Sequence, residues 1–330
     1  MKQIRLINDL ELVSAVKAAQ SVFITTHIRP DGDAIGSLLA MKLILTDMGK
    51  TVVACTADPV PEVFLFLPGA AEIIRPDQVP DPSVFDTAIA LDCSDSARMG
   101  AAEEIFRGIP VTVQLDHHHT NPLYAAHNEA DGESSSTGCM VWRLMGSLGV
   151  EMTASVAVCL YTAVSSDTGN FCFSCTDEET FLCAADIAST GIDINSVARN
   201  IHLLQPVGHV RHLARALSSL ALFCDGQCAS MILDKKDFEE AHALQEHMDG
   251  IVNYGLNLFG VKMAFLIDAS EEHAKKVSFR ALPPYDVSVI ASSLGGGGHV
   301  LASGCCVDMP LDELIHDIED KMIDQIRGAH

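Results

Sequence analysis

The chain has 330 residues, of which 48% are hydrophobic and 20% are charged, and its formal net charge is −23. This length is typical of two domains, and the apolar content is sufficient for a core in each. The low charged fraction and the absence of low-complexity runs argue against disorder. Binding of long nucleic acid depends on lysine and arginine that neutralise phosphates, so a chain this acidic is not expected to hold a long strand.

The N-terminal segment does not have the pattern of a signal peptide. Asp9, Glu11 and Lys17 interrupt the stretch where an apolar core would lie. An uncharged apolar run of about 18 residues is also absent, so we predict no membrane span. The 11 cysteines, an odd number without a secretion signal, favour free thiols in a reducing compartment. We therefore expect a cytoplasmic protein without membrane contact.

Short apolar runs alternate with helical patterns in the first part of the chain. Buried strands are predicted at 21–26, 51–55, 87–91 and 111–115. Helices are predicted at 34–48, 153–165 and 177–189. This alternation is typical of a parallel sheet with helices on both faces. We assign residues 1–192 to an α/β domain of this kind.

The pattern changes after Gly191. Residues 193–222 are predicted to be mostly helical and to form a connector. Further strands are predicted at 229–233, 262–267 and 275–282, and helices at 287–293 and 311–326. We assign residues 223–330 to a second, smaller α/β domain.

Carboxylates and imidazoles directly follow several of these elements. They are His27, Asp31 and Asp33 after the first strand, Asp92 after the third, Asp116, His117 and His118 after the fourth, and Asp167 after the helix that ends near 165. In doubly wound sheets, ligands bind beyond the carboxyl ends of the strands. So many acidic groups in one place would repel one another without cations. Oxygen and imidazole ligands suit two Mn²⁺ ions, with Mg²⁺ as an alternative, and two such ions about 4 Å apart can clamp a phosphoryl group.

Each motif has a simpler interpretation when it is taken alone. Asp31 and Asp33 could cap the following helix, Asp92 could cap a turn, and Asp-Thr-Gly at 167–169 is a common turn sequence. Tandem histidines could lie in an ordinary solvated loop. The metal-site hypothesis depends on the conjunction of all these motifs at one face.

The motifs resemble those of the DHH phosphoesterase superfamily, named for the triplet at 116–118. His-x-x-Pro-Asp-x-Asp-Ala-x-Gly-Ser at 27–37 matches its first motif, and Asp-Thr-Gly-x-Phe at 167–171 matches its fourth. The C-terminal part resembles the DHH-associated domain through Lys-Lys-Val-Ser-Phe-Arg at 275–280 and Gly-Gly-Gly-Gly-His at 295–299. The resemblance spans nearly the whole chain. It is greatest to the NrnA-type branch, which degrades very short RNAs and dephosphorylates the adenosine bisphosphate pAp.

The resemblance implies a role for each matched residue. The implied ligands of one metal are His27, Asp31 and Asp92, and those of the other are Asp33, Asp92, His117 and Asp167. Asp92 would bridge the two ions. His118 would face the substrate phosphate, and Asp116 would orient a histidine ring, so these two and Asp92 form the implied catalytic set.

The second domain would recognise the substrate. Arg280 offers a bidentate fork to a phosphate, and a glycine run lets backbone N–H groups approach one closely. The implied substrate-binding residues are His118, Arg280, Gly295, Gly296, Gly297, Gly298 and His299. A cleft between two domains would favour a short ligand. Taken alone, the glycine run could be a mobile turn.

Cysteines occupy two positions that depart from the superfamily pattern. Cys172 stands where many relatives have a basic residue, and Cys175 completes a Cys-x-x-Cys sequence. A redox switch is one interpretation, but we predict buried structural cysteines.

The expected function is hydrolysis of short oligoribonucleotides from one end, of the 3′-phosphate of pAp, or of both. Linear or cyclic dinucleotides are the alternative substrates. A manganese pyrophosphatase would carry a basic cluster near its C-terminus, and a RecJ-like exonuclease would carry added nucleic-acid-binding modules; the sequence has neither. A non-catalytic nucleotide sensor would have lost ligands that are retained here. Substrate preference, cleavage direction and a homodimeric state stay open.

Overall fold

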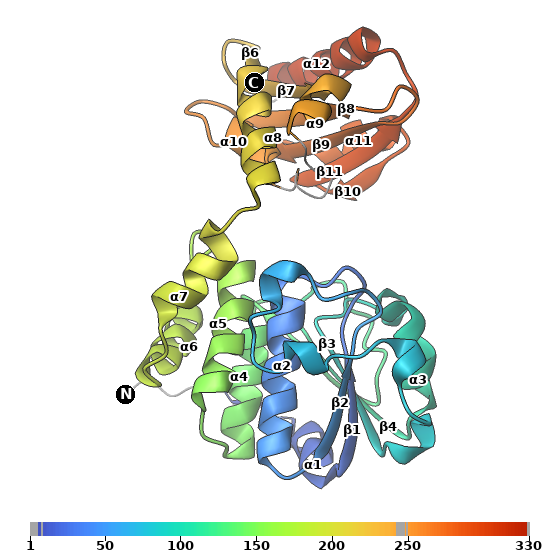
Figure 1. Ribbon diagram of the computed structural model, residues 1–330, viewed down its shortest axis with the longest axis vertical. Coiled ribbons are helices and arrows are strands. Elements are labelled where there is room, and N and C mark those ends of the chain that lie inside the picture. The colour runs from blue at the N-terminus through green and yellow to red at the C-terminus, as the bar shows by residue number, and fades with distance from the viewer. Residues whose placement is uncertain (1–5, 8, 242–247, 249, 329–330) are drawn as a thin grey trace. The chain divides into compact units, whose positions relative to one another are not determined.

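The computed structural model describes residues 6–7, 9–241, 248 and 250–328. The chain divides into two compact units, Met1–Leu204 and Gln205–His330 (Figure 1). The boundary falls inside residues 193–222, which were predicted to form a separate connector. Their first helix belongs to the first unit and their second helix to the second unit.

The first unit contains a five-stranded sheet with the strand order β2-β1-β3-β4-β5, in which all pairings are parallel. The strands are β1 (Ser21–Thr25), β2 (Thr51–Cys55), β3 (Thr87–Leu91), β4 (Val111–Asp116) and β5 (His127–Ala130). The parallel-sheet prediction is confirmed, but β5 was missed because its sequence His-Asn-Glu-Ala has no apolar pattern. The strand order reverses between β1 and β3, which is where ligands bind in such sheets.

Helices cover both faces of this sheet. They are α1 (Leu10–Ala18), α2 (Gly32–Asp47), α3 (Glu103–Gly108), α4 (Thr137–Leu148), α5 (Ala154–Asp167), α6 (Glu178–Ser189) and α7 (Ile194–Ala198). Short 3₁₀ segments occupy Glu62–Phe64, Ala70–Glu72, Pro76–Gln78, Pro82–Val84 and Ser96–Ala102, and a short π-helix spans Arg199–Leu203. Among the described residues, no helix is long and apolar enough to cross a bilayer.

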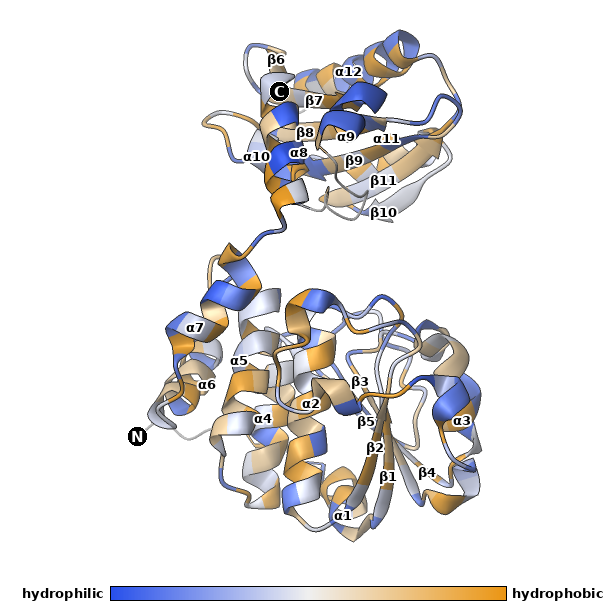
Figure 2. Ribbon diagram, viewed as in Figure 1, coloured by the Kyte–Doolittle hydropathy of each residue, from blue (hydrophilic) through white to orange (hydrophobic). Residues whose placement is uncertain are grey.

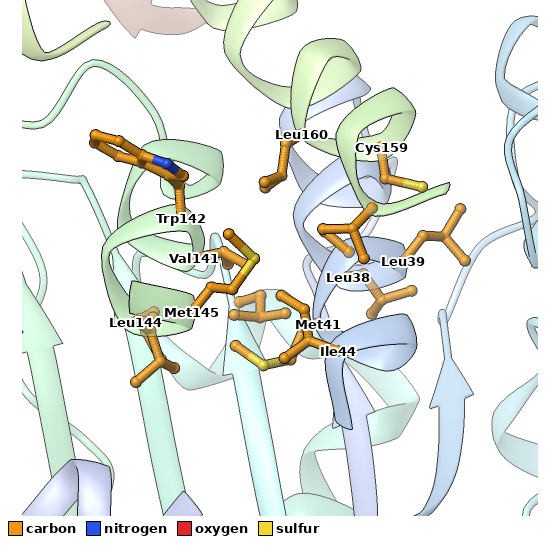
Figure 3. Close-up of a cluster of buried hydrophobic side chains, with 14 of the residues drawn as sticks. Leu38, Leu39, Met41, Ile44, Val141, Trp142, Leu144, Met145, Cys159 and Leu160 are labelled. Carbon is orange, nitrogen blue, oxygen red and sulfur yellow. The ribbon is translucent and has the colours of Figure 1, made fainter. Parts of the chain in front are cut away.

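Alternating strand residues supply two separate cores. Val22 and Ile24 pack with α1, α2, α4 and α5, whereas Phe23 packs on the opposite face with Met99 and Phe106. Figure 3 shows side chains of α2, α4 and α5 meeting in the larger core. These buried apolar runs account for the predicted strands.

The second unit contains a six-stranded mixed sheet with the order β10-β11-β9-β8-β7-β6. Its strands are β6 (Ala221–Phe223), β7 (Cys228–Asp234), β8 (Met263–Ala269), β9 (Lys275–Ala281), β10 (Gly297–His299) and β11 (Ala302–Val307). Its helices are α8 (Val207–Ser218), α9 (Lys235–Ala241), α10 (Val252–Leu256), α11 (Val287–Ser293) and α12 (Leu311–Gly328). The predicted second α/β arrangement is therefore confirmed.

Hydrophobic residues of the second unit also gather on both faces of its sheet. Phe265 and Ile267 face α11 and α12, whereas Ala264 and Leu266 face α8 and α10. The long helix α12 presents one buried stripe, formed by Leu314, Ile318, Met322 and Ile326. Figure 2 shows hydrophilic residues alternating with this stripe along the helix.

Candidate metal centre

The carboxyl ends of three adjacent strands begin the site. His27 lies two residues after β1, Asp92 directly follows β3, and His117 directly follows β4. Two helices add further carboxylates, since Asp31 precedes α2 and Asp167 is the last residue of α5. Parallel strands end at one edge of the sheet, and this is why residues so far apart in sequence meet.

Asp92 lies between two groups of side chains. Its Oδ2 is 3.4 Å from Nε2 of His27, and its Oδ1 is 3.5 Å from Nε2 of His117. His27 Nε2 is also 3.8 Å from Asp31 Oδ1. On the other side, His117 Nε2 is 3.0 Å from Asp167 Oδ2 and 3.9 Å from Asp33 Oδ2. The two oxygens of one carboxylate thus face different groups.

The ligand atoms are close enough to share cations. Three sets of side chains each bring their ligand atoms within 4.8 Å of one another: His27, Asp31 and Asp92; Asp33, His117 and Asp167; and Asp92, His117 and His118. The structure therefore brings together all six predicted metal ligands. Hard oxygen donors with some imidazole are the donor set that Mn²⁺ accepts.

The electrostatics of the group fit a cation site. Burial raises the pKa of Asp33 well above its usual range, and the charges of Asp167 and Asp92 raise it further. Burial would lower the pKa of His27, but the nearby carboxylates of Asp31 and Asp92 raise it to about 10. Bound divalent ions would replace the protons that these groups otherwise need.

The capping interpretation and the ligand interpretation are both compatible with Asp31. Its Oδ1 accepts hydrogen bonds from the backbone N–H groups of Asp33 and Ala34, which caps α2. Asp33 does not cap this helix. Its carboxylate instead accepts from the N–H groups of Thr137 and Gly138 at the start of α4, at 2.6 and 2.8 Å.

Backbone carbonyls orient two of the imidazoles. Nδ1 of His27 lies 2.8 Å from the carbonyl oxygen of Ile28, and Nδ1 of His117 lies 3.4 Å from that of Ser134. When Nδ1 of a neutral ring carries the proton and donates it to a carbonyl, the lone pair is on Nε2, which can then bind a metal ion. In both residues Nε2 is the atom nearest the carboxylates.

His118 is held by a different network. Its Nδ1 lies 2.8 Å from Oδ1 of the fully buried Asp116, and the other oxygen of Asp116 accepts from the amide of Asn121 at 2.6 Å. Asn121 also exchanges hydrogen bonds with Gln114. The hydrogen bond to Asp116 raises the pKa of His118. Asn121 was missed by the sequence prediction, although it lies in the same loop as the histidines.

Two predicted substrate-binding residues of the second unit, Arg280 on β9 and His299 on β10, lie on the strands that flank β11. Arg280 pairs with Ala302 across β9 and β11, and Ala302 pairs with His299 across β11 and β10. Residues opposite each other in a sheet share a face, so Arg280 and His299 project from the same face. Gly297 and Gly298 belong to β10, while Gly295, with φ of +78°, forms the turn before it. Part of the glycine run is therefore strand and not loop.

The prediction of buried structural cysteines at 172 and 175 is wrong. Both side chains are exposed. They lie in the turn segment between α5 and α6, where Sγ of Cys175 is 3.6 Å from the carbonyl oxygen of Asp167. A Cys-x-x-Cys sequence does not report on burial, which here depends on the course of a non-regular segment.

The comparisons with known proteins agree with this architecture. Residues 21–164 match the DHH family, N-terminal domain. The bifunctional oligoribonuclease and PAP phosphatase NrnA of Thermus thermophilus is 31% identical over 325 residues, which cover 97% of this chain and 94% of that protein. The chain therefore belongs to the DHH family of phosphoesterases.

Two solved structures share the fold. An exopolyphosphatase-related protein from Bacteroides fragilis has a TM-score of 0.88 at 23% identity and covers 97% of this chain and 96% of its own. RecJ of Thermus thermophilus in complex with Mn²⁺ has a TM-score of 0.53 at 11% identity, covering 98% of this chain and 55% of its own. At these identities both structures support the fold alone.

Proposed function

We propose that this protein is a two-metal phosphoesterase that hydrolyses short oligoribonucleotides and the 3′-phosphate of pAp. The observation that carries the proposal is the position of Asp92, whose two oxygens face two separate ligand groups 3.4 and 3.5 Å away. The substrate class is supported by the relative named an oligoribonuclease and PAP phosphatase, which covers nearly the whole chain.

Two Mn²⁺ ions would be held by the two groups around Asp92. One group is His27, Asp31 and Asp92, and the other is Asp33, Asp92, His117 and Asp167. When bound, the ions supply Lewis acidity that polarises a phosphoryl group and lowers the pKa of water. The mixture of carboxylate and imidazole ligands favours Mn²⁺ as the metal, with Mg²⁺ as the alternative.

His118 would hold a proton toward the substrate phosphate. Its Nδ1 is engaged by Asp116, so Nε2 is the ring atom left to contact a phosphate oxygen or to protonate a leaving oxygen. Because Asp116 raises the pKa of the ring, the charged form is favoured, which suits an anionic substrate. Asp116 would therefore act through His118.

The second unit would bind the rest of the nucleotide. Arg280 and His299 share one face of the sheet, beside the backbone of the glycine run. A guanidinium fork suits a second phosphate, such as the 5′-phosphate of pAp.

Free thiols at all 11 cysteines suit a reducing cytoplasm, which is the location we propose.

A panel of substrates tests the proposal. We would compare turnover of four substrates in Mn²⁺, in Mg²⁺ and after chelation. The substrates are pAp, an RNA dinucleotide, the linear dinucleotide formed by opening a cyclic dinucleotide, and pyrophosphate. We expect hydrolysis of pAp and the RNA dinucleotide in Mn²⁺, and none after chelation. Preference for pyrophosphate would favour a pyrophosphatase, and tight nucleotide binding without turnover would favour a sensor. Full activity in the chelated protein, verified by metal analysis, would exclude the two-metal mechanism.

A further inference from the structure

We infer that the segment 131–138, anchored by the buried Arg143, positions the metal centre, and that Thr137 is the positioning residue for Asp92. The inference rests on the proposed two-metal function. This segment, called here the positioning loop, joins the end of β5 to the start of α4. None of its residues belongs to the ligand set predicted from sequence.

The positioning loop contacts three of the candidate ligands. The backbone N–H groups of Thr137 and Gly138 donate to the two oxygens of Asp33 at 2.6 and 2.8 Å. The carbonyl oxygen of Ser134 lies 3.4 Å from Nδ1 of His117. One short segment therefore supports ligands that come from α2 and from the loop after β4.

The side chain of Thr137 makes the contact to the bridging carboxylate. Its hydroxyl donates to Oδ1 of Asp92 at 3.1 Å. This is the oxygen that faces His117, and the other oxygen faces His27. A donor fixed on one oxygen prevents the carboxylate from rotating about its Cβ–Cγ bond. Thr137 thus keeps each oxygen of Asp92 directed at its own ligand group.

Burial leaves little room for a substitute donor. Thr137 is fully buried, and Ser134, Ser135 and Ser136 are buried with it. A Cβ added to Gly138 would lie 2.5 Å from the Cβ of Ala163 on α5, so the loop packs directly against that helix. Water cannot readily replace a missing hydroxyl in so tight a place.

Arg143 holds the far end of the loop. Its side chain is only 1% exposed, although it carries a full charge. Nη1 donates to Oδ2 of Asp131 at 2.6 Å, and Nε donates to Oε1 of Glu179 on α6 at 2.8 Å. Thr180 adds a second link from α6, because its hydroxyl donates to Ser135 at 2.9 Å. The guanidinium therefore joins the first residue of the loop to α6.

Two variants at position 137 separate a positioning role from packing. Thr137→Val removes the hydroxyl but keeps the shape and the backbone N–H to Asp33, and Thr137→Ser restores a hydroxyl. Mn²⁺ binding would be measured on the metal-free full chain by the electron paramagnetic resonance signal of the free ion. A lost hydrogen bond to a charged group corresponds to roughly a ten- to hundredfold effect. We expect Thr137→Val to weaken the binding of at least one of the two Mn²⁺ ions by this factor. The fall in kcat should be larger than any change in KM. Thr137→Ser should stay near the unaltered protein.

Arg143→Met tests the anchor, with Arg107→Met as the matched control. The Arg107 side chain is 59% exposed and contacts Glu103 and Ser96 but none of the six candidate ligands, so its loss should change neither metal binding nor turnover. Arg143→Met should weaken Mn²⁺ binding in the same direction as Thr137→Val. If Arg143→Met does not fold, the comparison of Thr137→Val with Thr137→Ser still tests the positioning role.

The outcomes separate this inference from the proposed function. Unaltered Mn²⁺ binding and turnover in Thr137→Val would overturn the positioning role while the proposed function stood. Equal losses in Thr137→Val and Thr137→Ser would also overturn it, since packing would then explain both. Weakened Mn²⁺ binding in Thr137→Val alone supports the inference even if the unaltered protein hydrolyses none of the substrates tested, in which case only the proposed function fails.

Discussion

At the scale of single residues, Asp92 combines an uncommon backbone conformation with a carboxylate that faces both ligand groups. It follows β3 with φ of +55°, a left-handed conformation that is uncommon for a residue with a side chain. Backbone strain of this kind often marks functional positions. Here it accompanies a carboxylate that faces His27 with one oxygen and His117 with the other. A residue at this position serves two ligand groups at once.

Asp92→Asn should therefore remove turnover of nucleotide substrates. An amide presents only one oxygen, so it cannot bridge two cations as a carboxylate can. We expect activity to fall below about a thousandth of the unaltered rate, because both ions act in the two-metal mechanism. Circular dichroism should show that the variant is folded. A variant that keeps a substantial share of the activity would remove the bridging assignment.

Arg280 and His299 should act on the substrate and not on the metal. Both project from one face of the second sheet, in a different unit from the six candidate ligands. Loss of the guanidinium removes a charge-assisted contact of about 1.5–3 kcal/mol, which is roughly a ten- to hundredfold loss of kcat/KM on pAp. A small activated phosphate ester should be hydrolysed almost as before.

The measurements are metal stoichiometry and both activities in Arg280→Ala and His299→Ala. Arg280→Lys is the matched variant, since it keeps the charge without the fork. Loss of bound metal, or equal loss of both activities, would contradict this division of roles.

At the scale of elements, the contact between α2 and α5 sets the spacing of the candidate ligands. Helix α2 follows Asp31 and carries Asp33, and α5 ends at Asp167. A Cβ added to Gly36 would lie 2.6 Å from the carbonyl oxygen of Cys159 and 2.7 Å from the backbone nitrogen of Ala163. The two helices can approach this closely only because Gly36 has no side chain.

Gly36→Ala should destabilise the protein and weaken its metal site together. Overpacking of a tight core typically lowers the free energy of unfolding by about 1–3 kcal/mol. Here the added methyl group would collide with backbone atoms, which cannot move away by a side-chain rotation. The free energy of unfolding and the Mn²⁺ affinity should both fall. Gly108→Ala at the end of α3 is the control, because no atom lies within 4 Å of its added Cβ. A Gly36→Ala variant as stable as this control would show that the helices adjust freely.

The sequence predicted elements well where burial makes a periodic pattern. The four apolar strands β1 to β4 and the helix at 287–293 lie where they were expected. The missed strands were β5, β6, β10 and β11. The first three are short, polar or glycine-rich, and β11, with the sequence Ala-Ser-Gly-Cys-Cys-Val, has no regular alternation of polar and apolar residues. These segments become strands because they pair with a neighbouring strand, and a local sequence pattern does not indicate that pairing. The predicted phosphate turn at 295–298 is partly strand for the same reason.

The sequence also predicted which ligands converge, but not what holds them. His27, Asp92 and His117 follow strands, so the topology of a parallel sheet is enough to bring them together. Thr137 lies 45 residues from the Asp92 that it contacts, and Arg143 lies 36 residues from Glu179. Neither pair belongs to a motif with fixed spacing. Such partners become visible only when the packing of α4 and α6 is known.

At the scale of the whole molecule, the net charge leads us to expect weak binding of long nucleic acid. The sequence has 21 lysines and arginines against 44 aspartates and glutamates, which gives the formal charge of −23. Bound metal ions would offset this charge only where they lie. Phosphates of a long strand beyond the site would instead meet the field of a protein with a large excess of carboxylates, and we expect this field to repel them.

We therefore predict that RNAs of a few nucleotides are cleaved faster than long strands, and that salt narrows the difference. The Debye length falls from about 10 Å at 0.1 M salt to about 3 Å at 1 M, so added salt screens the repulsion of distant phosphates more than contacts inside the site. The measurement is kcat/KM for a dinucleotide and for a long unstructured RNA across this range, with metal concentration fixed. The ratio of the two values should move toward one as salt rises. A basic surface that recruits long strands would give the opposite trend, because salt would then weaken binding of the long RNA first. Equal rates on both substrates at low salt would indicate that the acidic surface does not govern substrate length, and would favour a processive exonuclease.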